Sequence, residues 1–323
     1  IVPHWPDAQA ARDEVMLALH ARKSAPAVQA WHAARGAHGL GVVLTGTDLY
    51  PDITRDALAL RSLDLADSLV VLQPQALQAL PPAARARARV VLQSCPARPT
   101  LAKTAQRLRV VMVGHLREEK NPAMLWRAVR AISPAASMVV EHIGQALSPA
   151  MAQQAEATAL ACPHYRWLGG LTHAQALQRI ARAHLLVHTS RSEGGAIVLS
   201  EALRCGTPVL ATNIWGTPEV VSQAAAGRLM ESRTGEALAA AWTDLMCHLP
   251  TREATLQHAC SFSWDSTTHG QLNLFRLNVI RVQNKLAKLK KLVVMHLKLW
   301  HVWLPLVMKS KLLKLRLLSC KLN

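Results

Sequence analysis

The stretch Glu193-Gly-Gly-Ala-Ile-Val-Leu-Ser-Glu201 sets two carboxylates eight residues apart, with a glycine pair directly after the first. Residues 185–192 have the apolar pattern of a buried strand and a turn, and residues 202–206 end in glycine, as helices often do. The glycine pair therefore lies where a strand passes into a helix. Backbone N–H groups and the positive end of the helix dipole favour a pyrophosphate there. A Gly-Gly pair and an acid in a first helical turn are also common without a ligand, so this stretch alone leaves both interpretations open.

The spacing of the two acids suits a nucleotide-sugar. Eight helical residues span about 12 Å at 1.5 Å per residue. One carboxylate can then bind a sugar's hydroxyls while the other binds a ribose diol across the same pyrophosphate. The following residues extend the pattern: residues 208–212 predict the next buried strand, and residues 217–224 predict a helix with Thr217 as N-cap and Pro218 at its first position.

Residues 193–221 resemble the donor-binding core of the family 4 glycosyltransferases, the glycogen-synthase-like enzymes with two facing Rossmann domains. That family's pattern is Glu-Gly-x6-Glu-Ala-x3-Gly-x-Pro-Val followed by Gly-x-Pro-Glu, and every element of it is present. A second stretch, Val113-Gly-His-Leu-Arg-Glu-Glu-Lys-Asn-Pro122, is similar to the family's Gly-Arg-Leu-x3-Lys-Gly loop. The resemblance makes Lys120 the phosphate-binding lysine. His115 stands where most members have arginine, and Arg117 is the alternative second phosphate contact.

Segments in the first hundred residues narrow the resemblance. They are Leu19-His-Ala-Arg-Lys-Ser24, Val43-Leu-Thr-Gly-Thr-Asp-Leu-Tyr50, Arg61-Ser-Leu-Asp-Leu-Ala-Asp67, Val70-Val-Leu-Gln-Pro74 and Leu80-Pro-Pro82. Together with Gly114-His-Leu-Arg117 and Ser192-Glu-Gly-Gly195, they are similar to the selenosugar synthases of selenoneine biosynthesis. That resemblance implies transfer of a sugar from UDP-N-acetylglucosamine to selenophosphate. After Gly206 the chain follows the general superfamily pattern, so the resemblance specifies the donor more closely than the acceptor.

The resemblance also implies which residues bind the donor. Gly114, at a strand end, lets the backbone approach the diphosphate, and Lys120 neutralises the charge that builds on the UDP leaving group. Residues 167–171 would lie near the uracil, although a plain strand end and turn explains them nearly as well. The predicted donor-binding residues are Gly114, His115, Arg117, Lys120, Gly169, Glu193, Gly194, Gly195 and Glu201.

The acceptor side is predicted at the end of the first strand, residues 15–19. Sheets of α/β proteins bind their ligands beyond the C-terminal strand ends, and His20 matches the superfamily's active-site histidine there. His20 and Glu193 are the predicted catalytic residues. Arg22 and Lys23 follow His20 and suit a phosphate-like oxyanion, while the alternative is a solvated turn.

Thr47 and Asp48 follow the second predicted strand. Their side chains can line the acceptor side of the cleft. Threonine, glycine and aspartate also form caps and turns readily, and the sequence does not separate the two interpretations.

Composition indicates a cytoplasmic enzyme. Six scattered cysteines with no C-x-x-C argue against a disulfide framework and a zinc site. No Asp-x-Asp pair and no paired histidine spacing occurs, so the sequence predicts a metal-independent enzyme whose UDP-sugar is a co-substrate and which has no cofactor. The net charge of +17 comes mostly from residues 277–323, which hold 11 Lys and Arg and no acidic residue. The high positive charge therefore does not indicate that the protein binds nucleic acid.

Apolar runs alternate with Ala-rich stretches, which predicts an α/β protein of two facing Rossmann-like domains of the GT-B type. The predicted parts are an acceptor-side domain with its linker at 1–105, a donor-binding domain at 106–262, a cross-over helix at 263–276 and a basic tail at 277–323. The first domain is expected to be truncated at its N-terminus by about 40–60 residues, or one to two βαβ units.

The Leu/Lys-rich tail has two interpretations. As a basic amphipathic helix it would make weak contact with an anionic membrane surface. Its abrupt change in composition also fits a foreign or frameshifted C-terminus without a role. For the whole chain, transfer of N-acetylglucosamine to selenophosphate is the first prediction. A family 4 glycosyltransferase with a glycolipid or polysaccharide acceptor is the alternative, and an inactive fragment or binding module is the second alternative.

Overall fold

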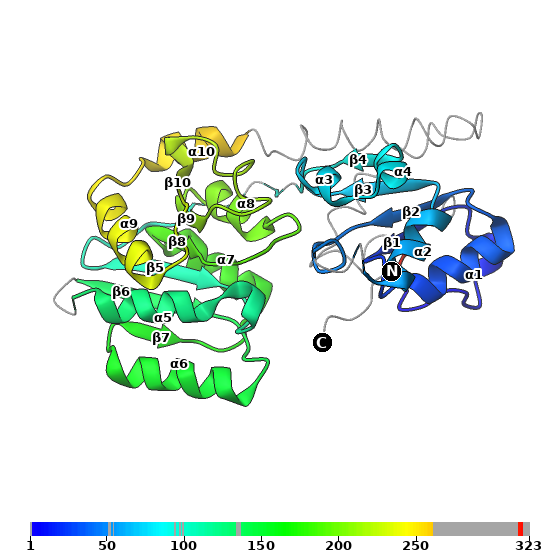
Figure 1. The fold of residues 1–323 in the computed structure, drawn as a ribbon. Helices are drawn as coiled ribbons and strands as arrows, with labels where there is room; N and C mark the ends of the chain where they lie inside the picture. Colours follow the sequence, from blue (N-terminus) through cyan, green and yellow to red (C-terminus); the bar gives the residue numbers. More distant parts are fainter. Residues whose placement is uncertain are drawn as a thin grey trace. The chain divides into compact units, whose positions relative to one another are not determined.

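The computed structural model describes residues 2–50, 53, 55–93, 95, 96, 98, 100–133 and 137–260, and the backbone of residues 316–318. The chain divides into two compact units. The first is formed by the described residues before residue 95 with strand β11, and the second by residues from 95 onward to 260. Each unit is a parallel sheet flanked by helices (Figure 1). The predicted α/β fold class with two domains is therefore confirmed.

The first unit is built on a five-stranded parallel sheet in the order β11-β1-β2-β3-β4. Strands β1 to β4 follow one another in sequence, and parallel crossovers are right-handed, so the connecting helices fall on one face. Helices α1 and α2 accordingly pack together, above a core centred on the fully buried Trp31. The elements are β1 (Met16–Leu19), α1 (Ala25–Arg35), β2 (Leu40–Val43), α2 (Ala57–Leu65), β3 (Ser68–Val71), α3 (Ala76–Ala79), α4 (Pro82–Arg85), β4 (Ala88–Val90) and β11 (Arg316–Leu318), with a 3-10 helix η1 (Ala10–Arg12).

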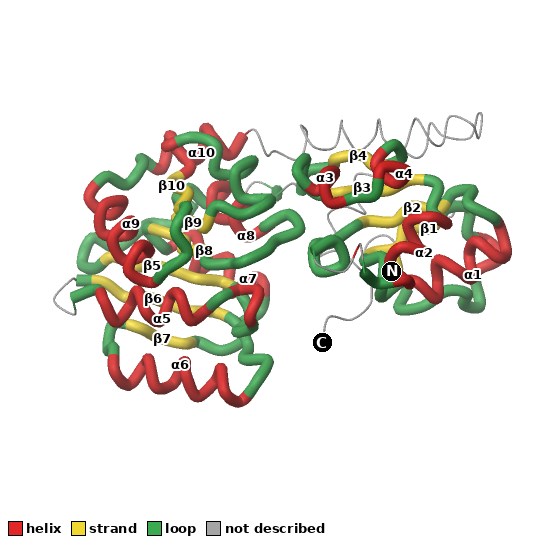
Figure 2. Tube along the Cα trace, in the orientation of Figure 1, coloured by secondary structure: helices red, strands yellow, loops and turns green. Residues whose placement is uncertain are grey.

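The second unit has a six-stranded parallel sheet in the order β10-β9-β8-β5-β6-β7 (Figure 2). Its strands are β5 (Leu108–Val113), β6 (Met138–Ile143), β7 (Tyr165–Trp167), β8 (Leu185–His188), β9 (Val209–Thr212) and β10 (Gly227–Met230). Its helices are α5 (Pro122–Ala131), α6 (Pro149–Ala161), α7 (His173–Arg182), α8 (Ile197–Arg204), α9 (Gly235–Cys247) and α10 (Arg252–Ala259), with 3-10 helices η3 (Glu118–Lys120) and η4 (Ala224–Ala226). Two apolar cores cover the two faces of the sheet.

The strand order reverses between β5 and β8, and this fixes where a ligand can bind. From β5 the chain adds β6 and β7 on one side, then returns to place β8, β9 and β10 on the other. The loops that leave β5 and β8 therefore diverge, and the crevice between them is the switch point where open α/β sheets bind ligands. Strand β8 is buried at every position, as expected of a central parallel strand covered on both faces.

The predicted helix at residues 217–224 is wrong. The residues from 217 to 220 form turns, and the Thr217 hydroxyl donates to the Thr212 carbonyl at 2.9 Å instead of capping a helix. Only the 3-10 helix η4 follows, before the unpredicted strand β10. Helix α10 was also not predicted. Its N-cap is Thr251, whose hydroxyl accepts from the amide of Ala254 at 3.2 Å.

The predicted linker, residues 97–105, belongs to the second unit where it is described. The Lys103 ammonium donates to the Gly206 carbonyl at 2.9 Å, and Arg252 donates to the Leu101 carbonyl. The predicted cross-over helix at 263–276 lies outside the described residues. So does the tail at 277–323, apart from β11, which pairs in parallel with β1. No helix in the described part of the chain has the length and apolar character to span a bilayer.

Candidate functional site

Two loops meet at the switch point of the second unit. One leaves β5 at Gly114 and passes through η3 to Lys120, and the other leaves β8 and runs through Glu193 to helix α8. The amide of Arg191 donates to the carbonyl of Glu119 at 2.8 Å, and the hydroxyl of Thr189 donates to the carbonyl of Lys120 at 2.8 Å. The loop after β8 thus donates one main-chain and one side-chain hydrogen bond to main-chain carbonyls of the loop after β5.

The join brings Lys120 and Glu193 into an ion pair. Glu193 accepts at Oε1 from the Lys120 ammonium and from the Ser190 hydroxyl at 2.6 Å, and His188 Nε2 lies 3.2 Å from the same oxygen, outside hydrogen-bond geometry. Among the described residues, none contacts Oε2. Burial raises the pKa of Glu193, but the charge of Lys120 and the contact with His188 outweigh burial and hold the pKa well below its usual range. Glu193 is therefore ionised at neutral pH.

Glycines shape the loop ends around this pair. A Cβ at Gly114 would lie 3.3 Å from Lys120 Cδ, so the glycine leaves room for the lysine stem. A Cβ at Gly144, in the loop after β6, would lie 2.0 Å from the Gly114 carbonyl oxygen. Gly169 follows β7 in the left-handed region at φ 66°, and its carbonyl accepts from the amide of Gly144 at 2.8 Å. The loop after β6 therefore packs against the loop after β5 on one side and the loop after β7 on the other.

Gly194 and Gly195 lie where the sequence predicted, between Glu193 and the start of α8. Ala196 follows them in the left-handed region at φ 44° and is the N-cap residue of α8. The turn into the helix is thus made by the glycine pair and a left-handed alanine. The free amides at the start of α8 lie beside Glu193 in the sequence, as an anion site requires.

His115 and Arg117 are the two predicted candidates for the second phosphate contact. His115 Nδ1 accepts from the amide of Gln145 at 3.1 Å. Burial, with Arg117 and Lys120 nearby, lowers the pKa of His115, so its imidazole is neutral and carries its proton on Nε2. The Arg117 Nε lies 3.8 Å from Glu119 Oε2. Of these two side chains, only the guanidinium of Arg117 carries a permanent positive charge that could bind a phosphate.

Glu201 has a partner that the sequence pattern did not indicate. Its Oε1 lies 2.6 Å from Nε2 of His173, the first residue of α7. A capping box formed by Thr172 and Gln175 fixes the start of that helix. The His173 contact joins α7 to α8 and holds the Glu201 carboxylate, which is 12% exposed.

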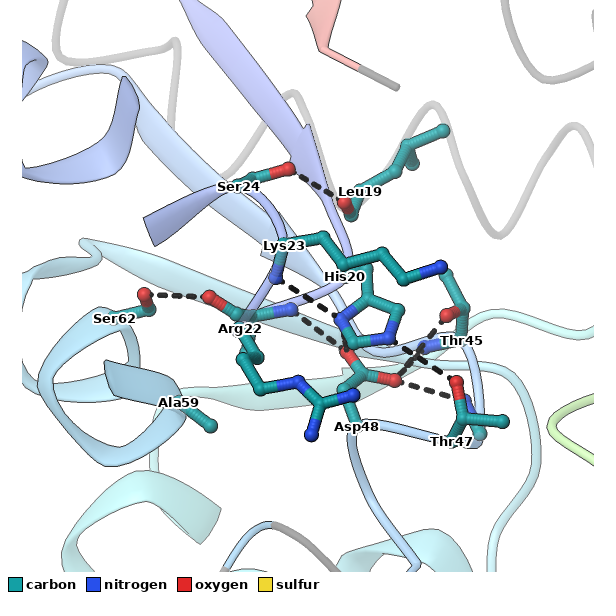
Figure 3. A network of polar contacts seen from close by, with 12 residues as sticks. Leu19, His20, Arg22, Lys23, Ser24, Thr45, Thr47, Asp48, Ala59 and Ser62 are labelled. Atoms are coloured by element: carbon teal, nitrogen blue, oxygen red, sulfur yellow. Dashed lines mark hydrogen bonds and ion pairs between the residues drawn. The ribbon is translucent and has the colours of Figure 1, made fainter. Parts of the chain in front are cut away.

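In the first unit, His20 follows β1 in a strained backbone conformation. Its φ is 74°, which is rare for a non-glycine residue and costs on the order of 1–3 kcal/mol. The imidazole is 4% exposed. Nδ1 accepts from the amide of Lys23 at 3.3 Å, and Nε2 lies 3.1 Å from Thr47 Oγ1 (Figure 3). Because Nδ1 accepts, the neutral imidazole carries its proton on Nε2 and donates it to Thr47.

Asp48 forms the backbone contacts that the turn interpretation of this segment predicts. Its buried carboxylate accepts from the amides of Ala21 and Thr45, each at 2.8 Å, and of Gly46 at 3.0 Å (Figure 3). Asp48 Oδ2 also lies 3.8 Å from His20 Nδ1. Asp48 therefore ties the loop after β2 to the loop after β1. Its predicted contact with an acceptor stays a prediction.

Arg22 and Lys23 extend from the same loop as His20. The Arg22 side chain is 42% exposed, and its guanidinium lies 3.9 Å from Asp56 Oδ2. Lys23 is held to His20 through its amide (Figure 3). Both cations thus lie beside the predicted catalytic histidine. No group of three or more His, Cys, Asp or Glu side chains that could hold a metal ion occurs in the described ranges.

Comparisons with known proteins identify the family of the second unit. Residues 97–259, half of the chain, match the family model described as glycosyl transferases group 1. A D-inositol 3-phosphate glycosyltransferase of Rhodococcus opacus is 30% identical over 201 residues, which cover 57% of this chain and 44% of that protein. The chain thus spans about half the length of the curated relatives it matches.

Two solved structures share the fold. The sucrose-phosphate synthase of Thermosynechococcus elongatus has a TM-score of 0.69 at 17% identity, covering 84% of this chain and 74% of its own. The pneumococcal O-GlcNAc transferase GtfA, solved in complex with UDP and GlcNAc, has a TM-score of 0.63 at 17% identity, covering 84% of this chain and 58% of its own.

Proposed function

The chain belongs to the group 1 glycosyl transferases, and from this premise we propose that its second unit binds the diphosphate of a UDP-sugar at the switch point between β5 and β8. The observation that carries the proposal is the ion pair of Lys120 and Glu193, formed by the two loops that diverge there. A cation for the diphosphate and an acid for the sugar are thus held side by side.

The charges and positions of the site residues suggest a role for each in the reaction. In glycosyl transfer, the bond from the sugar's anomeric carbon to the diphosphate oxygen breaks, and negative charge builds on UDP. The Lys120 ammonium and the amides at the start of α8 stabilise that charge. Glu193 stays ionised, and its Oε2 can accept hydrogen bonds from sugar hydroxyls. In the proposed site Glu201 binds the ribose diol with its position set by His173, and Gly169 lies on the uracil side.

The donor we propose is UDP-N-acetylglucosamine. The fold neighbour solved with UDP and GlcNAc supports this choice by analogy alone. The catalytic contribution of the first unit is assigned to His20 at the end of β1, whose Nε2 contacts the hydroxyl of Thr47 in the loop after β2.

The acceptor we propose is selenophosphate. Arg22 and Lys23 supply two cations beside His20, which suits a multiply charged oxyanion. The names of the relatives favour a second candidate acceptor, D-inositol 3-phosphate, which also carries a phosphate. The two candidates share the phosphate and differ in the attacking atom, which is selenium in the first and a hydroxyl oxygen in the second.

The experiment has two steps. Titration of the purified chain with UDP by calorimetry tests the donor site, and a folded chain without affinity for UDP would contradict it. The chain is then incubated with UDP-N-acetylglucosamine and either selenophosphate or D-inositol 3-phosphate, with UDP release and product mass as readouts. Release with selenophosphate and formation of a selenosugar support the first candidate. Release with the inositol phosphate alone supports the second.

A further inference from the structure

Thr189 is a buried residue that holds the proposed phosphate-binding lysine through its main chain. It directly follows β8 and is fully buried. Its hydroxyl lies 2.8 Å from the Lys120 carbonyl and 3.1 Å from the Asn121 carbonyl. The single hydroxyl proton is shared mainly between these two oxygens, and Met112 Sδ lies 3.6 Å from the same hydroxyl. The contact spans 69 residues of sequence and joins the loop after β8 to the loop after β5.

The segment that Thr189 holds needs an external contact. Asn121 lies in the left-handed region at φ 47°, which most non-glycine residues avoid and which asparagine adopts at a smaller cost. Pro122 follows it and begins helix α5. A loop with this local cost relaxes unless neighbouring groups fix it. The Thr189 hydroxyl and the Arg191 amide on the Glu119 carbonyl fix its main chain, and the Arg191 guanidinium adds side-chain contacts to Glu118 at 3.2 Å and Asn121 at 3.5 Å.

Fixing the main chain of Lys120 also restricts the position of its ammonium group. The Lys120 carbonyl is fixed by Thr189, its stem packs at Gly114, and its ammonium contacts Glu193. The loop of Thr189 also carries Ser190 and Glu193. Thr189 therefore fixes the positions of both loops that carry the ion pair, while its own side chain is fully buried.

We propose that Thr189 is a positioning residue for donor binding, which acts by fixing the main chain of Lys120. The proposal rests on the proposed function of Lys120 and adds a residue to it. A pre-positioned cation binds a diphosphate more tightly than a mobile one, because less conformational entropy is lost on binding.

The matched control is Thr207. This residue is also fully buried, and its hydroxyl is likewise shared between two carbonyls, those of Ile180 at 2.8 Å and Ala183 at 3.3 Å. It lies before β9, at the opposite end of the strands from the ion pair. Thr→Val keeps the shape of either side chain and removes the same hydrogen bond, so the two variants have similar effects on stability.

The experiment compares Thr189→Val, Thr189→Ser and Thr207→Val in the full chain. We expect Thr189→Val to weaken UDP binding by up to about tenfold, because the free energy of the lost internal hydrogen bond, about 1 kcal/mol, limits how strongly it can couple to binding. Thr207→Val keeps wild-type affinity at a similar melting temperature, and Thr189→Ser, which keeps the hydroxyl, restores binding. Equal UDP affinity in Thr189→Val and Thr207→Val would overturn the proposal.

Hydrogen exchange separates this proposal from the proposed function. The amides of Lys120 and Asn121 donate within their loop at 3.0 and 3.1 Å, and should exchange faster in Thr189→Val but not in Thr207→Val. If the wild type is folded and binds no UDP, the proposed function fails, and the exchange rates alone decide whether Thr189 fixes the loop. Unchanged rates at both amides would refute the positioning role.

Discussion

At the residue scale, the two carboxylate oxygens of Glu193 differ in their hydrogen bonds, and the candidate site depends on this difference. Lys120 and Ser190 donate to Oε1, whereas Oε2 has no partner among the described residues. A carboxylate held at one oxygen keeps a fixed direction at the other. It can then accept from a hydroxyl at a defined position without reorganising, which is the property that favours catalysis.

Replacing Glu193 by Gln should lower kcat/KM for the UDP-sugar about 100-fold, because the charge that orients the sugar and pairs with Lys120 is lost. Steady-state kinetics of UDP release measure the effect. Glu231→Gln is the control, since Glu231 is exposed and accepts only from Asn213 at 2.6 Å in the described contacts. Turnover by Glu193→Gln at the rate of the control would exclude Glu193 from the reaction.

The ion pair also predicts a pH-dependent stability. Lys120→Met keeps the stem and removes the charge, leaving a buried carboxylate unpaired, which costs about 3 kcal/mol in the free energy of unfolding at pH 7. The pKa of Glu193 is lower in the folded chain than its unfolded value of about 4.3. Its contribution is therefore complete above that pH and is lost as the pH falls through the folded pKa. The gap between wild type and variant should narrow below about pH 4 in urea unfolding.

The control for this experiment is an exposed pair. Arg228 and Asp244 are 49% and 64% exposed, so Arg228→Met should change the free energy of unfolding by less than about 1 kcal/mol. A Lys120→Met variant with an equally small effect, or a gap that persists unchanged at pH 3, would show that the pair does not stabilise the fold.

At the element scale, local patterns explain what the sequence could predict. Strand β5 is apolar from Val110 to Val113 and strand β8 from Leu185 to Val187, and a loop with glycine and charged residues follows each, so the strand ends could be predicted from the sequence. That Lys120 and Glu193 bind a donor stays a prediction. The contacts of Thr189 were not predictable in the same way. They depend on β5 lying next to β8 in the sheet, and no local pattern encodes which strands are neighbours.

The error at residues 217–224 has a local physical cause. Thr217 followed by proline fits a helix start, but the same hydroxyl can bond back to the preceding carbonyls. In the fold it donates to the carbonyls of Thr212 and Ile214 at 2.9 and 2.8 Å. These contacts close the turn after β9, and the chain reaches β10 without a helix.

The packed glycine loops give a prediction with two matched substitutions. Gly144→Ala would bring a Cβ to 2.0 Å from the Gly114 carbonyl oxygen, a main-chain atom that cannot move aside, and should cost about 3 kcal/mol in stability. Gly169→Ala has open space around its Cβ and should cost only about 1 kcal/mol for its left-handed φ. Urea unfolding measures both. Equal costs would mean that the loop after β6 does not pack against Gly114.

At the scale of the whole molecule, each unit presents polar residues where its strands end. His20 and Thr47 follow β1 and β2 in the first unit, and Lys120 and Glu193 follow β5 and β8 in the second. Both sheets are parallel, so each gathers these residues at one edge. A transfer reaction needs a donor and an acceptor, and the proposed function assigns one to each unit.

The predicted metal independence of the enzyme can be tested directly. Charge that builds on a departing diphosphate is stabilised either by a bound metal or by fixed cations and helix ends. The described residues provide Lys120 and the start of α8 for the second route, and metal independence follows if these suffice. We expect millimolar EDTA to leave UDP release unchanged, whereas Lys120→Ala lowers it about 100-fold. Loss of turnover in EDTA that Mg²⁺ or Mn²⁺ restores would show that the cations of the chain are insufficient and that a metal shares the charge.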